Sequence, residues 1–315
     1  MGKDALVPAV LVLGFNRPDK LEQIFRAAQA AGVTRLYVSL DGARPDRPTD
    51  QERCIAAKKL AQGQTWAKRL EINASEENLG CGLGVSRGIS WFFSFEEEGI
   101  ILEDDCLPAL SFFPFASEML DRFRSDERIM MISGTNLSGA EGNISAPSHE
   151  YSYFYSRHGS IWGWATWRRA WQQYDISMPT WPAAKQTGLL HALFSNMNWR
   201  LYWQRKFDGM HRGRRDTWDF AWLYTYWSQH ALAVIPATNQ ITNIGYGPDA
   251  THTNSGGDPF LGLSSEPLAF PLRHPPLIFS DQAYDDLLRG ILCPGKWRRR
   301  FRRWSKFLGS HSRTS

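Results

Sequence analysis

Three consecutive carboxylates, Glu103, Asp104 and Asp105, follow the short apolar run Ile100-Ile101-Leu102. Such a run predicts a strand buried on both faces, and open α/β sheets bind their ligands at the carboxyl ends of these strands. Adjacent acids repel one another, so a cation is expected among them. Mg²⁺ and Mn²⁺ prefer oxygen ligands and commonly join a carboxylate to a substrate phosphate. The run therefore indicates a divalent metal site, although a solvated acidic turn has the same composition.

A glycine-rich segment, Glu77–Gly84, precedes a predicted helix. Backbone amides and the dipole at a helix N-terminus attract phosphate, which makes Asn78 and Gly80 candidate contacts to a phosphorylated ligand. Arg87, one turn into the helix, can fork onto a diphosphate. The spacing is not the dinucleotide-binding fingerprint, because the glycines alternate and no acid follows at the required distance.

Two more polar residues follow predicted strands. Arg17 comes after the first strand and Asp41 after the second, and parallel strands would bring both to one crevice. An acid at such a position can accept hydrogen bonds from a base or a ribose. Each residue also suits a helix cap or a turn, and that alternative stays open.

Strands and helices alternate through the first 135 residues. Predicted strands cover residues 8–15, 35–40, 70–73 and 128–133, besides the one that precedes the acids, which residues 106–108 are expected to end. Asn16 and the capping-box sequence Thr49-Asp50-Gln51-Glu52 are expected to start the first two helices. This alternation predicts an α/β fold with a Rossmann-like, mostly parallel sheet and helices on both faces, whose residues 1–135 bind a nucleotide.

Residues 136–280 are expected to complete the same continuous domain, because no linker or internal repeat interrupts the chain. Ten of the 14 tryptophans lie between Trp162 and Trp227. Most of them are expected in the core, with two or three at a site. We expect helices at 163–174, 197–207 and 216–229, strands at 151–156 and 231–236, and loops at 139–150 and 244–259.

The chain carries four short segments in a fixed order: Val10–Pro18 (VLVLGFNRP), Ser39–Gly42 (SLDG), Asn78–Gly80 (NLG) and Leu102–Asp105 (LEDD). In this order they resemble the GT-A glycosyltransferases. The nearest likeness is to the N-acetylglucosaminyltransferase I type, whose metal motif is also Glu-Asp-Asp. Because no membrane stem precedes the first strand, the resemblance is to bacterial sugar transferases of that general type.

Two segments extend the resemblance to about residue 250. Gly159–Trp164 (GSIWGW) is similar to the acceptor-side Gly-Trp segment of the family, and Thr217–Trp222 (TWDFAW) is similar to its Trp-Asp motif, which carries the catalytic base. The resemblance thus implies acceptor contacts in this half of the chain. The implied acceptor-binding residues are Trp162, Gly163, Trp164 and Trp218.

The resemblance also implies a nucleotide-diphosphate sugar as donor, with Asp105 as the direct ligand of Mn²⁺ or Mg²⁺. Glu103 and Asp104 are then expected to hydrogen-bond the ribose, the donor sugar or metal-bound water. The remaining expected donor contacts are Arg17, Asp41, Asn78, Gly80 and Arg87.

Asp219, in the Trp-Asp segment, is implied to be the base that deprotonates the acceptor hydroxyl in an inverting mechanism. Burial among aromatic neighbours would raise its pKa. The structural alternative is an ion pair with Arg214 or Arg215, and Asp216 is the reserve base. His252 is a candidate contact to metal or diphosphate, or else a surface histidine.

Residues 281–315 are expected to form a basic amphipathic tail. The net charge of +4 depends on residues 296–308, which hold seven basic residues and no acid, so the rest of the chain carries −3. Apolar residues in this segment recur at helical spacing, a pattern typical of a helix on an anionic membrane surface. A nucleic-acid arm has the same charge, but nothing else in the chain reads bases, so no nucleic-acid partner is expected.

The segment Met1–Phe15 is a poor signal peptide, because Asp4 and Pro8 interrupt it and no small-residue cleavage site follows. No apolar run approaches the roughly 18 residues that span a bilayer. The four cysteines form no CxxC pair, which favours reduced thiols. We therefore expect a cytoplasmic protein, peripheral at the inner face of the cytoplasmic membrane.

The sequence predicts a metal-dependent, inverting glycosyltransferase acting on a glycan or lipid-linked acceptor in bacterial surface polysaccharide or lipopolysaccharide synthesis. A sugar nucleotidyltransferase is an alternative, but its signature loop after the first strand does not match Gly14–Pro18. A non-catalytic glycan- or membrane-binding protein with the same fold is the other alternative.

Overall fold

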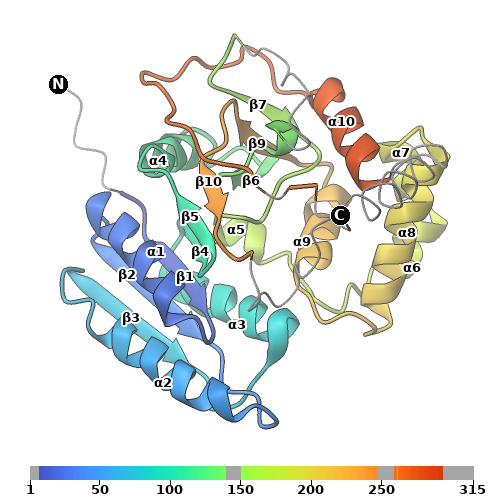
Figure 1. Ribbon diagram of the computed structural model, residues 1–315. Coiled ribbons are helices and arrows are strands. Elements are labelled where there is room, and N and C mark those ends of the chain that lie inside the picture. Colours follow the sequence, from blue (N-terminus) through green and yellow to red (C-terminus); the bar gives the residue numbers. More distant parts are fainter. Residues whose placement is uncertain (1–6, 140–149, 247–258, 261, 294–315) are drawn as a thin grey trace, which may run out of the picture.

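The computed structural model describes residues 7–139, 150–246, 259, 260 and 262–293. An eight-stranded sheet in the order β3-β2-β1-β4-β8-β6-β9-β7 runs through the molecule (Figure 1). Its strands are β1 (Val10–Gly14), β2 (Arg35–Leu40), β3 (Arg69–Ala74), β4 (Glu98–Glu103), β6 (Ile129–Ser133), β7 (Tyr153–Ser156), β8 (Trp164–Trp167) and β9 (Leu232–Pro236). A smaller sheet pairs β5 (Cys106–Pro108) with β10 (Ile241–Asn243) in antiparallel fashion.

Helices cover both faces of the large sheet (Figure 1). They are α1 (Pro18–Ala30), α2 (Pro48–Gln62), α3 (Gly80–Phe95), α4 (Phe112–Arg122), α5 (Arg168–Trp171), α6 (Trp181–Gln186), α7 (Leu189–Leu193), α8 (Met197–His211), α9 (Asp219–Ser228) and α10 (Gln282–Leu292), with a 3₁₀ turn at Leu137–Gly139. Along β1, Val10 and Val12 join the core cluster of α1, α2 and α4, whereas Leu11 and Leu13 join that of α3, α8 and α9. This alternation follows from the two-residue period of a strand. Among the described residues, no helix has both the length and the apolar character needed to cross a membrane.

Strands β3, β2, β1 and β4 are parallel neighbours. In β1, Val10 lies opposite Leu36 of β2 on one side and Ile100 of β4 on the other. The chain thus winds away from β1 in two directions, which places a topological switch point at the carboxyl ends of β1, β2 and β4. The predicted α/β fold, with a large and mostly parallel sheet between helices, is confirmed.

The helix predicted at residues 163–174 is wrong. Residues 164–167 form β8, which pairs antiparallel with β4 and β6, and only α5 in that range is helical. Trp164, Trp167 and Trp171 fall at positions i, i+3 and i+7, a spacing that imitates a helix. Backbone pairing on both edges of β8 decides in favour of the strand, because a buried strand there satisfies its amides and carbonyls through both neighbours.

The two predicted halves share one sheet, because β8 lies between β4 and β6 of the first 135 residues. Helix α10 also belongs to the folded body, since three of its side chains are buried there: Tyr284, Leu288 and Ile291. The predicted start of the tail at residue 281 is therefore wrong. Residues 296–308, and His252 with most of the loop predicted at 244–259, lie outside the described residues.

Three expected helix starts also differ. Asn16 does not cap α1 but donates to Asp50 Oδ1 at 2.6 Å, and Arg17 is the residue before the helix. Asp50, expected in a capping box, is instead buried and paired with Arg44. A proline opens both α1 and α2 with its φ already helical, so neither start requires a side-chain cap. Helix α3 begins at Gly80, so the glycines expected in a loop form its first turn.

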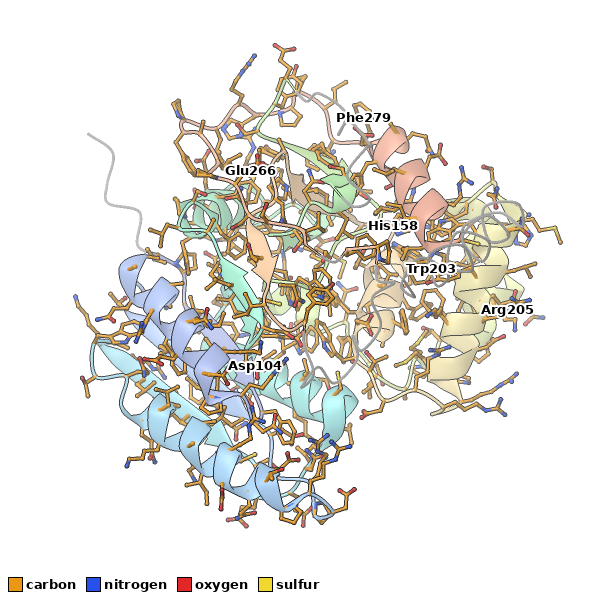
Figure 2. All side chains as sticks on the ribbon, in the orientation of Figure 1. Asp104, His158, Trp203, Arg205, Glu266 and Phe279 are labelled. Atoms are coloured by element: carbon orange, nitrogen blue, oxygen red, sulfur yellow. The ribbon has the colours of Figure 1, made fainter. Side chains whose placement is uncertain are left out.

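A buried histidine lies in the aromatic core of the second half (Figure 2). The imidazole of His158 stacks on Phe194 and Trp203, with ring centroids 5.7 and 6.0 Å apart, and meets the edge of Trp227 at 5.2 Å. Its Nε2 has no hydrogen-bond partner among the described residues. Burial lowers the pKa of His158 to about 4, so this ring is neutral at physiological pH.

The neutral imidazole of His158 makes stability depend on pH. Because its pKa in the fold is about 4, below the 6.5 of an ordinary histidine, its contribution is complete above pH 6.5 and is lost as the pH falls toward 4. We expect the free energy of unfolding to drop by about 2 kcal/mol more in the wild type than in His158→Phe between about pH 7.5 and pH 5. Urea unfolding at both pH values measures this, with the exposed His191→Phe as control. An unchanged pH dependence in His158→Phe would contradict the prediction.

Candidate functional site

A cavity of about 700 Å³ opens at the switch point, where the carboxyl ends of β1, β2 and β4 meet α3 and the segment before α9. Its volume is typical of a small-molecule site. The residues proposed from the sequence that line it are Arg17, Asp41, Asn78, Gly80, Arg87, Glu103, Asp104, Asp105, Trp162, Asp216, Trp218 and Asp219. Gly163 and Trp164 are not among the lining residues. Segments from both halves of the chain therefore meet at one cavity.

An arginine from the end of β1 pairs with two acids of the cluster at the end of β4. Figure 2 labels one of these acids, Asp104. Arg17 donates through Nε and Nη2 to the two carboxylate oxygens of Asp104, with Nε 3.2 Å from Oδ2, and through Nη1 to Asp105 Oδ2 at 3.1 Å. Arg17 was expected to contact the donor, yet its guanidinium here supplies the cation that the sequence required among the acids.

The three acids differ in what remains available to a ligand. Both oxygens of Asp104 accept from Arg17, and its side chain is only 3% exposed, whereas that of Asp105 is 20% exposed. Burial raises the pKa of Asp104 to about 6 against the influence of Arg17. Burial, with the charges of Asp105 and Asp104, raises the pKa of Glu103 to about 8, and Glu103 Oε1 is buried without a partner among the described residues.

These oxygen donors fit a hard divalent cation. Asp105 reaches the cavity, and the unpartnered Glu103 Oε1 is a further acceptor for metal-bound water. No group of three or more His, Cys, Asp or Glu side chains in the described part of the chain is arranged around a metal position. One carboxylate suffices for Mg²⁺ or Mn²⁺ where substrate phosphates and water complete the shell.

Two carboxylates occupy the amides at the start of α3. Asp41 accepts from the backbone N–H of Leu79 at 2.8 Å and of Gly80 at 3.1 Å, and Asn78 Nδ2 donates to it at 3.0 Å. Asp216 accepts from Cys81 N at 3.2 Å and from a fourth amide, that of residue 82, at 2.7 Å. The amides predicted to hold phosphate are thus already paired, so Asn78 and Gly80 position Asp41 in this structure.

The candidate base is placed by its neighbours. Asp219 is the first residue of α9 and accepts a hydrogen bond from the hydroxyl of Thr217. Burial raises the pKa of Asp219, which the bond from Thr217 partly opposes. Within the described residues no ion pair joins Asp219 to Arg214 or Arg215, so the pairing considered as an alternative is absent. Asp216, the reserve base, lies before the helix and uses its carboxylate on α3.

The aromatic residues divide between the cavity and the core. Trp162 lines the cavity and meets Tyr246 and Phe260 edge to face, with ring centroids 6.3 and 6.2 Å apart. Trp164 is fully buried and stacks on Trp218 at 5.6 Å, so it is a core residue and not an acceptor contact. Trp218 borders the cavity with 1% of its surface exposed.

Gly163 also has a structural role. Its φ is +61°, and a Cβ there would lie 2.4 Å from Ile241 Cδ1. The glycine therefore allows the sharp turn between the cavity residue Trp162 and the core strand β8. The expectation that Gly163 contacts an acceptor is not supported by its position.

The sequence prediction placed a loop at residues 244–259, but it named neither Asn243, the last residue of β10, nor Gly245 as a site residue. Asn243 and Gly245 line the cavity, Ile244 N donates to Asp105 O at 2.8 Å, and a Cβ on Gly245 would lie 2.3 Å from Asp105 Oδ2. Strand β10 reaches Asp105 because it pairs with β5, and residues 106–108 of β5 were expected only to end a strand. The signal available in the sequence was the Gly- and Asn-rich composition after Ile241.

Two further residues, Arg44 and Cys81, line the cavity. Arg44 lines the wall beside Asp41, and its guanidinium pairs with Asp50. Cys81 also lines the cavity, but burial raises the pKa of its thiol to about 12, so it stays protonated and is a poor nucleophile. No described feature of the cavity thus suggests thiol chemistry.

Comparison with models of known protein families finds no match for the chain, and comparison with curated proteins finds no significantly similar one. The functional argument therefore depends on the site alone.

Removing the cation from the acid cluster should destabilise the fold. Arg17→Met leaves Asp104 buried without its partner, so we expect a loss of about 3 kcal/mol in the free energy of unfolding at neutral pH. Asp104→Asn added to Arg17→Met should recover part of that loss, because the most buried unpaired charge is then removed and only the more exposed Asp105 lacks its partner. Urea unfolding of the two single variants and the double variant measures both effects.

The exposed ion pair of Arg26 with Glu22 is the matched control, with side chains 75% and 48% exposed. Arg26→Met should change stability by less than about 1 kcal/mol. A loss in Arg17→Met no larger than that of Arg26→Met would show that the cluster does not depend on Arg17.

Proposed function

We propose that this protein is a metal-dependent, inverting glycosyltransferase with the GT-A fold. Its donor is a nucleotide-diphosphate sugar, and its acceptor is a glycan or a lipid-linked glycan. The observation that supports the proposal is one cavity with Asp105, at the end of β4, in one wall and Asp219, at the start of α9, in another. In such a transfer a charged nucleoside diphosphate leaves the donor sugar and a hydroxyl of the acceptor loses its proton. The enzyme therefore needs a metal ligand and a base at one site.

The donor occupies the first half of the cavity. Open α/β sheets bind nucleotides where their strand order reverses, and Asp41 and Arg87 line that region. Arg87 is exposed and takes part in no ion pair among the described residues, so its guanidinium is free to fork onto the diphosphate. Asp41 is held by four donors, and its role is to shape the wall for the base or ribose.

The metal ligand is Asp105, whose side chain is more exposed than that of Asp104 and whose oxygens are not both paired with Arg17. Asp105 would hold Mn²⁺ or Mg²⁺, which would supply positive charge to stabilise the diphosphate leaving group. Glu103, whose Oε1 lacks a partner, orients water or a donor hydroxyl beside it. Arg17 holds Asp104 in place and reduces the repulsion among the three carboxylates.

The acceptor hydroxyl gives its proton to Asp219. A base must be ionised before it acts, and burial raises the pKa of this carboxyl toward the pH at which it works. Thr217 donates to Oδ1 of Asp219 and so restrains the carboxylate at the cavity. Trp162 offers an aromatic surface for the acceptor sugar.

The reaction is placed at the cytoplasmic face of a bacterial membrane, in surface polysaccharide or lipopolysaccharide synthesis. The basic, aromatic sequence of residues 296–308 supports this setting, since it suits an anionic lipid surface.

A panel of UDP-, GDP- and dTDP-sugars tests the function. With Mn²⁺, one donor should release its nucleoside diphosphate slowly, and the rate should fall when the metal is chelated. Asp105→Asn should abolish the metal-dependent release of nucleoside diphosphate. Asp219→Asn should lower kcat for transfer by about 10²- to 10⁴-fold, because the acceptor proton loses its base.

Glu52→Gln, an exposed change on α2, is the control and should leave turnover unchanged. Absence of turnover with every donor, with and without metal, would favour a binding protein. Release of pyrophosphate from a nucleoside triphosphate and a sugar phosphate would favour a nucleotidyltransferase.

Trp162 separates acceptor binding from chemistry. Trp162→Ala removes the aromatic surface but leaves Asp105 and Asp219 in place, so KM for the acceptor should rise by about 10-fold or more while donor hydrolysis persists. Trp66→Ala is the comparison, because Trp66 packs against the same core cluster as Trp162 but does not line the cavity. Equal effects of the two changes on acceptor KM would contradict a direct contact.

A further inference from the structure

Asp216 lines the cavity among the described residues, yet neither the donor binding nor the proton transfer above assigns it a role. It lies in the connection between α8 and α9, yet its carboxylate bonds to the first turn of α3, some 134 residues away in sequence. Oδ2 accepts from Cys81 N at 3.2 Å, and Oδ1 from Gly82 N at 2.7 Å. A carboxylate is favoured there by the free amides and by the positive end of the helix dipole.

The glycines of α3 make this approach possible. A Cβ on Gly80 would lie 2.5 Å from Asp216 Oδ2, and a Cβ on Gly82 would lie 2.9 Å from Oδ1. Gly80 also has φ +76°, a conformation that L residues rarely adopt. Glycines at positions 80 and 82, in the first turn of α3, reduce the stability of the helix. Because they lack a Cβ, they leave room for the carboxylate of Asp216.

Asp216 is linked to the candidate base, Asp219, through Thr217. Thr217 follows Asp216 directly, its backbone N lies 3.4 Å from the Cβ position of Gly82, and its hydroxyl donates to Asp219. Helix α3 packs through Ile89 and Phe92 on the sheet that ends in the acid cluster. A short chain of contacts therefore joins the donor half to Asp219, through Asp216 and Thr217.

We propose that Asp216 is a positioning residue that fixes the start of α9 on α3 and so sets Asp219 across the cavity from Asp105. The inference rests on the proposed function for its catalytic consequence, but the contact itself is independent of any donor. Displacement of a base by about 1 Å can cost on the order of 100-fold in rate. The role predicts that Asp216 affects transfer through geometry and not through its own proton.

A double-mutant cycle between Asp216→Ala and Gly82→Ala tests it. Gly82→Ala adds one methyl that meets Asp216 Oδ1, so it should lower kcat for transfer by 10-fold or more and leave donor KM within about threefold. In the Asp216→Ala background the same methyl meets no carboxylate, so its added effect should vanish. Asp216→Asn keeps one of the two acceptor oxygens and should fall between the wild type and Asp216→Ala. The lower limb of the pH–rate profile should keep its midpoint in every variant, since Asp219 remains the base.

Gly290→Ala is the matched control, because a Cβ at that position of α10 meets nothing within 4 Å. It should leave kcat unchanged in both backgrounds. The same cycle measured by urea unfolding, without donor, tests the contact separately: coupling in stability is expected even if every donor fails to turn over, and that combination would contradict only the proposed function.

Three results would overturn the inference. Additive effects of Gly82→Ala and Asp216→Ala on both stability and kcat would show that the two residues do not act together. A lower donor KM in Asp216→Ala would show that the carboxylate instead obstructs amides that the donor needs. Loss of the acidic limb of the pH–rate profile in Asp216→Asn would make Asp216 the base itself.

Discussion

The pairing of Arg17 with Asp104 and Asp105 is the interaction on which the site depends. Three acids cannot lie at the end of a buried strand without a cation, because neighbouring charges in a poorly solvated place repel strongly. The cation comes from the end of β1, the strand directly beside β4, and the parallel pairing brings the two ends together. One backbone arrangement thus builds the cluster and supplies a cation to it.

That arrangement was largely readable from the sequence. Short apolar runs that end in Arg17, Asp41 and Glu103 predicted parallel strands, and strand ends of a parallel sheet converge whatever the details of packing. The strands expected at 35–40 and 128–133 match β2 and β6 within one residue. The place of Arg17, Asp41 and the three acids at the cavity follows from this convergence, because each of them was predicted at a strand end.

The second half was harder to predict, for a physical reason. Its tryptophans fill a core, and apolar spacing reports burial but not the backbone that produces it, so β8 was taken for a helix and Trp164 for a ligand contact. The prediction that the start of α3 binds phosphate met a different obstacle. Amides at a helix N-terminus attract any anion, and the sequence could not show that Asp41 and Asp216 would reach them first. Contacts between segments more than 100 residues apart are set by the whole fold.

The hydrogen bonds at the cavity also narrow what its acids can do. Asp41 and Asp216 are paired with amides, and Asp104 with Arg17. A carboxylate whose oxygens are already bonded can bind a ligand only by giving up those bonds, which costs free energy. Asp105 retains accessible oxygen, and Glu103 retains an unpaired one. The bonded acids Asp41, Asp104 and Asp216 therefore contribute mainly by holding the walls of the cavity in place, with Asp105 at the end of β4 in one wall and Asp219 at the start of α9 in another.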